Sequence, residues 1–137
     1  MEKPKSPPLS MIARIDHFVL TVHNIDRTID FYARGLGMRL ETFGDNRRAL
    51  TFGNQKINLH EAVAKPILPR AHAPKPGSSD FCLIASQPLT KVIIDLQQKG
   101  IAIELGPVDR TGATGKIRSI YLRDPDMNLV EISEYLS

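Results

Sequence analysis

A short strand-like pattern occurs twice in this chain and constrains its fold more than any other feature. Residues 15–22 read Ile-Asp-His-Phe-Val-Leu-Thr-Val, and alternate side chains of a strand face opposite sides, so His17 lies on the face opposite Phe18. Residues 80–85, Asp-Phe-Cys-Leu-Ile-Ala, repeat the pattern with Asp80 in the place of His17. The repeat predicts a chain built from two copies of one unit.

The same order of elements follows each copy of this strand. In the first unit, 11–62, apolar spacing and turn residues predict a helix over 27–34 and strands over 38–43, 48–52 and 56–60. In the second unit, 78–135, they predict a helix from Pro88 to Gly100, strands over 101–105, 117–122 and 129–133, and a flexible loop over 106–115. The predicted fold class is α+β, with two tandem βαβββ units that form a curved, partly open sheet around a central cavity.

The two units are expected to form a single domain over residues 11–135. The segment 63–77 is predicted to link them, because its prolines exclude a helix or a central strand; they are Pro66, Pro69, Pro74 and Pro76. Residues 1–10 contain Lys and Pro without an apolar stretch, so they are predicted to be a mobile tail and not a secretory signal.

The composition excludes several classes of protein. The chain is 42% hydrophobic and 24% charged and has no apolar run of about 18 residues, so we expect no membrane partner. The net charge of +3 is spread along the chain without a nucleic-acid-binding motif, so we expect no nucleic-acid partner. Cys82 is the only cysteine, which excludes an internal disulfide and fits a reducing, cytoplasmic location.

Polar side chains interrupt the first and last strands of each unit, where a buried strand would be apolar. They are His17, Asn58, His60, Asp80 and Glu131. Imidazole and carboxylate groups bind divalent ions such as Zn²⁺, Ni²⁺, Mn²⁺ or Fe²⁺, so the histidines and acids of this set are candidate ligands of one metal ion per site. Each also has a structural interpretation, as a hydrogen-bonded histidine, a turn-capping aspartate or a solvated carboxylate. Their equivalent places in two units favour the metal interpretation.

These features resemble a known family. Residues 124–131, Asp-Pro-Asp-Met-Asn-Leu-Val-Glu, close the last predicted hairpin. With the first-strand histidine and the two βαβββ units, they resemble the vicinal oxygen chelate family of glyoxalases, bleomycin-resistance proteins and extradiol dioxygenases. Residues 15–22, 30–32, 35–38, 56–60, 106–108 and 123–126 resemble its glyoxalase domain-containing protein 5 branch. The resemblance covers about residues 11–135.

The resemblance implies one divalent metal ion and a small substrate with vicinal oxygens. His17 matches the first-unit ligand of the family and Glu131 the final ligand, whereas Asp80 stands where a second histidine is usual. Glyoxalase I commonly has a glutamate on the fourth strand. The closest register places Asn58 there, and His60 follows on the same face, so the fourth-strand ligand is left open between them.

The same resemblance suggests catalytic and substrate-binding roles. In a glyoxalase-type reaction the metal would polarise two vicinal oxygens, and Glu131 or His60 would move the proton as the catalytic base. The candidate substrate-binding residues are Asn58, Ser119, Tyr121 and Arg123. The last three alternate along one predicted strand and suit a carboxylate or a phosphate, or equally the polar rim of a sheet.

Three functions follow as alternatives. The leading one is a metal-dependent, glyoxalase I-like (lactoylglutathione lyase-like) enzyme. The second is another metal chemistry of the family, either ring-cleaving dioxygenation or thiol addition to an antibiotic. The third is a metal-free binding protein of bleomycin-resistance type. By analogy with the family, we expect a homodimer.

Overall fold

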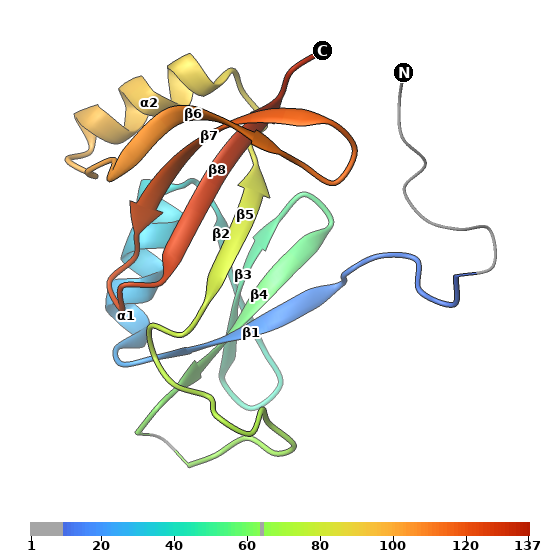
Figure 1. The fold of residues 1–137 in the computed structure, drawn as a ribbon. Coiled ribbons are helices and arrows are strands. Elements are labelled where there is room, and N and C mark those ends of the chain that lie inside the picture. Colours follow the sequence, from blue (N-terminus) through green and yellow to red (C-terminus); the bar gives the residue numbers. More distant parts are fainter. Residues whose placement is uncertain (1–9, 64) are drawn as a thin grey trace. The chain divides into compact units, whose positions relative to one another are not determined.

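The computed structural model describes residues 10–63 and 65–137 (Figure 1), so the predicted tail lies outside the described residues except for Ser10. The first half contains β1 (His17–Val22), α1 (Ile25–Ile29), the π-helix η1 (Asp30–Gly35), β2 (Arg39–Phe43), β3 (Arg47–Phe52) and β4 (Gln55–Glu61). The second half contains β5 (Asp80–Ile84), α2 (Leu89–Gln98), β6 (Leu105–Thr111), β7 (Lys116–Arg123) and β8 (Leu129–Tyr135). Each half runs strand, helix, three strands, which confirms the predicted α+β fold.

The strands form two open sheets with the same internal order. One sheet runs β1-β4-β3-β2 and the other β5-β8-β7-β6. In the first sheet β1 pairs with β4 in parallel, while β4 pairs with β3, and β3 with β2, in antiparallel fashion. The first and last strands of each repeat are therefore neighbours, and residues at opposite ends of one repeat come to lie on adjacent strands.

The chain divides into two compact units. The β1–β4 unit comprises Ile15–Asp80 together with Asp124–Leu129. The β5–β8 unit comprises chiefly Phe81–Arg123 and Val130–Ser137. The turn between β7 and β8 thus belongs to the β1–β4 unit, although it lies near the end of the chain. No helix in the described part of the chain is long and apolar enough to span a membrane.

The core of each unit follows the apolar alternation of its strands. In the β1–β4 unit the fully buried side chains include Leu20, Val22, Leu50 and Ile57, from three adjacent strands. In the β5–β8 unit they include Leu89, Leu96, Ile120, Leu122 and Val130. Two of these, Leu89 and Leu96, come from one face of the helix α2. At the start of that helix the carboxylate of Glu134 accepts a hydrogen bond from the backbone N–H of Leu89 (2.9 Å), so this donor is satisfied.

The helix predicted over 27–34 consists of two consecutive helical segments. Asn24 caps the first, because its side-chain oxygen accepts a hydrogen bond from the backbone N–H of Arg27 (3.0 Å). From Asp30 the chain continues as the wider π-helix η1, which ends at Gly35. Gly37 then adopts φ +81°, a conformation that glycine reaches without steric cost, and directs the chain into β2.

The turn from Asp124 to Asn128 is held by a buried network in the β1–β4 unit. One carboxylate oxygen of Asp124 accepts hydrogen bonds from the backbone N–H groups of Asp126 and Asn128, both at 2.9 Å. The other accepts from the side-chain amide of Asn128 (2.8 Å) and from the hydroxyl of Tyr32 (2.7 Å). Burial, with the nearby Asp124 carboxylate, raises the pKa of the Tyr32 phenol, so it stays a donor. The motif that resembles the family therefore has a structural role in this turn.

The prediction for residues 101–115 was wrong. A strand was predicted over 101–105 and a flexible loop over 106–115, but residues 101–104 form no strand and β6 spans Leu105–Thr111. Pro107 cannot donate a ladder hydrogen bond, and the pairing with β7 is irregular between Leu105 and Val108. A proline is tolerated there because β6 is the edge strand of its sheet.

Candidate functional site

One face of the β1–β4 sheet carries polar residues that the sequence had singled out. In the parallel pair of β1 and β4, Val19 lies opposite Asn58 and Thr21 lies opposite His60. Side chains alternate along each strand, and paired residues share a face, so His17, Asn58 and His60 lie on one side of this sheet. The apolar core lies on the other side.

His17 begins β1, and its imidazole is held by the preceding residue. Its Nδ1 lies 2.8 Å from a carboxylate oxygen of Asp16, and its side chain is 43% exposed. A carboxylate at Nδ1 favours the tautomer that carries the proton there, which leaves the lone pair of Nε2 available. Because such pairs commonly orient metal-binding histidines, His17 is suited to bind a metal ion through Nε2.

Two polar atoms of β4 are buried without a hydrogen-bond partner among the described residues. They are Oδ1 of Asn58 and Nε2 of His60, and Asn58 as a whole is only 5% exposed. A buried polar group left unpaired costs roughly 1–3 kcal/mol, and folded proteins retain few of them. These two unpaired atoms are therefore candidate contacts for a ligand.

The register of the sheet places Asn58 nearer to His17 than His60. His17 lies directly opposite Lys56, so along β4 Asn58 is offset by two residues and His60 by four. At roughly 3.3 Å per residue, these offsets are about 7 Å and about 13 Å along the strand. The geometry favours Asn58 as the neighbour of His17.

Arg47 on β3 lies opposite His60. Arg48 pairs with Leu59 in the antiparallel ladder, so the next residues outward, Arg47 and His60, face one another. Burial, together with the positive charge of Arg47, lowers the pKa of His60 below its ordinary value of 6.5. His60 is therefore neutral at pH 7, and the adjacent guanidinium makes this end of the sheet more favourable for an anion than for a metal ion.

The predicted carboxylates lie on two neighbouring strands of the second sheet. Asp80 is the first residue of β5, as His17 is of β1, and its side chain is exposed. Glu131 lies on β8, which is the neighbour of β5, and is partly buried.

Hydroxyl groups connect three strands of the β5–β8 unit. The side-chain oxygens of Ser119 and Ser133 lie 2.6 Å apart, and both residues are fully buried. Ser133 also donates to a carboxylate oxygen of Glu131 (3.4 Å) and lies 3.2 Å from Sγ of Cys82. Burial raises the pKa of the Cys82 thiol, so it is not an activated nucleophile. Ser119 thus contributes to an internal network around Glu131.

The other two predicted substrate-binding residues already have partners. Nε of Arg110 donates to the hydroxyl of Tyr121 (3.0 Å). Arg123 makes a two-pronged pair with Glu104, with N–O distances of 3.0 and 3.2 Å, and these hydrogen bonds lower the pKa of Glu104. A substrate anion would compete with Glu104 for Arg123, which makes Arg123 less suitable than an arginine without a carboxylate partner.

Arg47 was missed by the sequence interpretation, although the sequence contained a signal for it. The two-residue turn Gly53-Asn54 makes Phe52 and Gln55 a pair, and counting outward from that pair places Arg47 opposite His60. Arg47 was not among the predicted site residues, because alternation within one strand does not identify its partner on another.

The described residues contain no group of three or more His, Cys, Asp or Glu side chains that could hold a metal ion. In the β1–β4 unit, the donors best placed for a ligand are Nε2 of His17 and Oδ1 of Asn58. They are a mixed nitrogen and oxygen pair, which divalent metals accept.

The paired βαβββ units and the polar sheet face define the class of protein. The model of the Glyoxalase/Bleomycin resistance protein/Dioxygenase superfamily matches residues 14–132, and the chain belongs to this superfamily. The resemblance to the vicinal oxygen chelate family is thereby confirmed.

Two relatives are similar over most of the chain. Virulence protein STM3117 of Salmonella typhimurium is 55% identical over 126 residues, covering 92% of this chain and 87% of the relative. Its crystal structure superposes with a TM-score of 0.89, covering 93% of this chain and all of that one. Glyoxalase domain-containing protein RDO1 of Mycosarcoma maydis is 50% identical over 124 residues, covering 90% of this chain and 69% of the relative.

A third similar structure is the integron cassette protein VCH_CASS1 from the mobile metagenome of V. Cholerae. It is 45% identical, superposes with a TM-score of 0.90, and the match covers 93% of this chain and 99% of that one. None of these three names states a reaction.

Proposed function

We propose that this chain is a metal-dependent enzyme of glyoxalase type that acts on a small substrate with vicinal oxygens. The observation that carries the proposal is the polar face of β1 and β4. There, Asp16 orients His17, and Asn58 presents a buried oxygen that has no partner among the described residues.

Two donors of this face, from His17 and Asn58, are of kinds that a divalent ion accepts. His17 would bind it through Nε2 and Asn58 through Oδ1. The carboxylates of Asp80 and Glu131 stay ligands predicted from the sequence and do not belong to this face. When bound, such an ion supplies electrostatic stabilisation to a substrate with two adjacent oxygens. Asp16 holds the His17 ring and favours the tautomer that binds metal.

In this proposal, His60 or Glu131 is the base that accepts the proton from the substrate. His60 is neutral at pH 7 because burial and Arg47 lower its pKa, so it can accept a proton from a substrate carbon. Glu131 is the alternative base from the sequence interpretation, and its hydrogen bond from Ser133 would orient its carboxylate.

Elemental analysis of protein purified without chelators tests the metal proposal. We expect about one divalent ion per chain in the wild type and in His72→Ala, a control histidine in the exposed segment after β4. We expect loss of the ion in His17→Ala. In Asp16→Asn we expect metal affinity lowered about 10- to 100-fold, because Asp16 acts on the metal only by orienting the His17 ring. Glu131→Gln tests the predicted carboxylate ligand separately.

Activity on the hemithioacetal of methylglyoxal and glutathione tests the reaction class. We expect turnover with the metal identified by elemental analysis, reduced about 100-fold or more in His17→Ala and unchanged in His72→Ala. If the protein binds metal but lacks this activity, the proposed metal site stands and the glyoxalase-type reaction is refuted. Oxygen consumption with Fe²⁺ would then indicate dioxygenation.

The second candidate function is a metal-free small-molecule-binding protein. It is favoured by the lack of a three-residue group of metal-binding side chains among the described residues. Protein that retains no ion after incubation with Ni²⁺, Zn²⁺, Mn²⁺ and Fe²⁺ would refute the enzyme proposal and support this one.

A further inference from the structure

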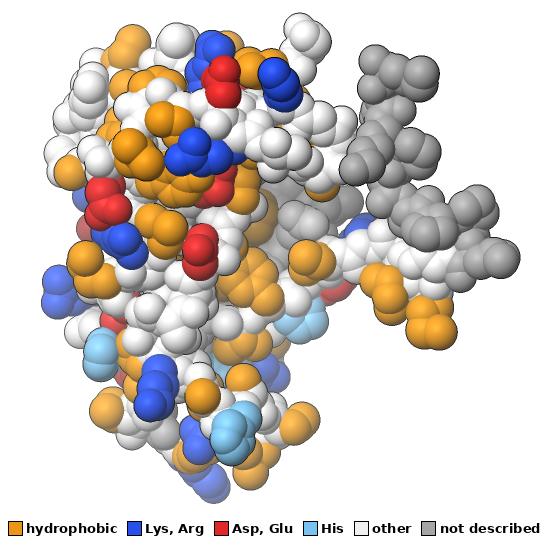
Figure 2. All heavy atoms as spheres, in the orientation of Figure 1, with side chains coloured by type: hydrophobic (Ala, Val, Ile, Leu, Met, Phe, Trp, Pro, Cys, Tyr) orange, Lys and Arg blue, Asp and Glu red, His pale blue; other side chains and the backbone are white. Residues whose placement is uncertain are grey.

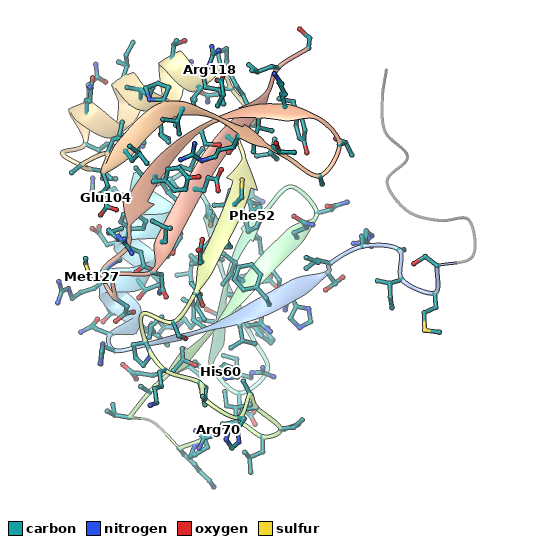
Figure 3. The ribbon with its side chains drawn as sticks, in the orientation of Figure 1. Phe52, His60, Arg70, Glu104, Arg118 and Met127 are labelled. Carbon is teal, nitrogen blue, oxygen red and sulfur yellow. The ribbon has the colours of Figure 1, made fainter. Side chains whose placement is uncertain are left out.

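A pocket of about 520 Å³ opens in the β1–β4 unit at the ends of β1 and β4. Its walls come from the strand ends, the start of α1, the turn between β2 and β3, and the segment 65–74 that follows β4. In Figure 3, His60 on β4 and Arg70 in that segment both lie in this part of the unit, and both line the pocket. The prediction had treated this segment only as a linker.

The lining carries both basic and acidic side chains, with one more cation than anion. Arg47, Arg48, Lys65 and Arg70 line the pocket together with His60, and Lys, Arg and His side chains gather over the same region in Figure 2. The acidic residues of the lining are Asp26, Asp45 and Glu61. The formal balance is four cations to three anions, before any contribution from His60.

The charges are not mutually neutralised. Arg48 lies 3.8 Å from the carboxylate of Asp26, a pair that uses one cation and one anion. Among the described residues, Arg47, Lys65 and Arg70 have no carboxylate within ion-pair distance. Three cations of the lining are therefore available to a ligand, alongside two further lining carboxylates, Asp45 and Glu61.

Of the lining cations, Arg47 gives the strongest indication of what the pocket binds. Its Nε is buried and has no hydrogen-bond acceptor among the described residues. Its guanidinium carbon lies 4.9 Å from the centre of the Phe43 ring, so a cation–π contact holds one side of the group without using its N–H donors. A planar guanidinium fixed in this way, with a buried donor unpaired, is preorganised for an oxyanion.

His60 adds a second unpaired atom beside Arg47. Its Nε2 is also buried without a partner, and the residue lies opposite Arg47 across the β3–β4 ladder. Two observations point to an anionic ligand. They are the two unpaired polar atoms on facing strands and the three lining cations without an ion-pair partner.

We propose that this pocket binds the anionic group of a small molecule, a phosphate or a carboxylate, with Arg47 as its principal contact and Lys65 and Arg70 as supporting charges. The site does not require the metal proposed above, because it is built on β3, β4 and the segment 65–74, and only His60 is common to both proposals. It would hold the charged end of a ligand at the edge of the polar sheet face.

Titration of metal-free protein with inorganic phosphate tests this proposal. The protein is freed of metal on a chelating resin, and phosphate is added at constant ionic strength while the Nε–H signals of the arginines are followed by NMR. We expect a saturable shift of the Arg47 signal, with the Arg34 signal unmoved, because Arg34 lies on η1 outside the pocket and pairs with Asp30. A parallel titration with acetate distinguishes a carboxylate ligand from a phosphate ligand.

Charge-neutral variants give the second readout. We expect Arg47→Gln to weaken phosphate binding at least 10-fold, Arg70→Gln to weaken it about 3-fold, and Arg34→Gln, which removes the same charge elsewhere, to leave it within 2-fold. Arg70 is exposed in a segment without regular structure, so its variant tests the pocket even if Arg47→Gln is destabilised.

Some outcomes would overturn the proposal. An Arg47 signal unaffected by both phosphate and acetate would do so, as would equal weakening by Arg70→Gln and Arg34→Gln, which would indicate only a general effect of net charge. Because the titration uses metal-free protein, its failure would leave the metal-dependent function standing, and loss of the metal function would leave anion binding intact.

Discussion

The Asp124 carboxylate shows how one residue can determine a turn. It accepts four hydrogen bonds, two from backbone N–H groups and two from side chains, while its residue is only 3% exposed. A buried carboxylate needs such donors, because its charge would otherwise be strongly disfavoured away from water. The hydroxyl of Tyr32, which is contributed by η1, is the donor furthest away in the sequence.

Tyr32→Phe is predicted to destabilise the protein. The variant keeps the aromatic ring but removes a buried hydrogen bond to a carboxylate, so we expect a loss of about 1.5–3 kcal/mol in the free energy of unfolding. Guanidinium titration followed by circular dichroism measures it. Tyr121→Phe, which removes a hydroxyl bonded at an exposed position, is the control and is expected to change stability by less than about 0.5 kcal/mol. Equal effects of the two variants would show that the Tyr32–Asp124 bond contributes little.

At the scale of elements, the edge strand β6 depends on a close backbone approach at Gly106. Its φ is +114°, and a Cβ there would lie 2.5 Å from the carbonyl oxygen of Ser119 and 3.0 Å from Cα of Ile120, both on β7. Glycine therefore allows β6 to pair with β7 beside Pro107, where the ladder is irregular.

Gly106→Ala is predicted to be more destabilising than Gly37→Ala. Both glycines have positive φ, but a Cβ at Gly37 would meet nothing within 4 Å. We expect about 1–2 kcal/mol for Gly37→Ala, from backbone strain alone, and on the order of 3 kcal/mol or more for Gly106→Ala, because the ladder must also shift. Thermal unfolding of the two variants compares them, and an equal loss would mean that the contact with β7 relaxes freely.

At the scale of the whole molecule, several large apolar side chains remain exposed near the start of the chain. Met11, Ile12 and Ile15 are 94%, 66% and 68% exposed, and Val19 on β1 is 42% exposed. Apolar side chains gathered in one stretch are costly in water and commonly mark an interface. The homodimer expected from the resemblance to the family would be one way to bury them, and it stays a prediction.

Sedimentation equilibrium tests the homodimer prediction. We expect a mass of twice the 15.3 kDa chain at micromolar concentration. The double variant Ile12→Glu with Ile15→Glu is expected to shift the protein toward monomer, because burying the new carboxylates at an interface would be unfavourable. Ile94→Glu, at a position on α2 that is also exposed (53%), is the control and should remain dimeric. A wild-type protein that sediments as a monomer would contradict the prediction.

The order and kind of the elements could be predicted from the sequence, because they depend on local chemistry. The repeated strand pattern, the prolines of 63–77 and the glycine turns act over a few residues, and they predicted two βαβββ units correctly. Alternation also placed His17, Asn58 and His60 on the faces where they are found. Where local signals conflicted, as at Gly106-Pro107, the prediction failed, because strand pairing at a sheet edge overrode the preference for a loop.

Which partner each side chain has could not be predicted from the sequence, because it depends on how the folded chain packs. Glu104 engages Arg123, Ser133 engages Ser119, and Tyr32 engages Asp124, and each pair joins elements whose contact depends on the packing of the chain. Arg47, which was not among the predicted site residues, has a buried Nε, a Phe43 ring against it and His60 across the ladder. The physical reason is that the face of a side chain follows from the period of its own strand, whereas its partners follow from how strands distant in the sequence pair and pack.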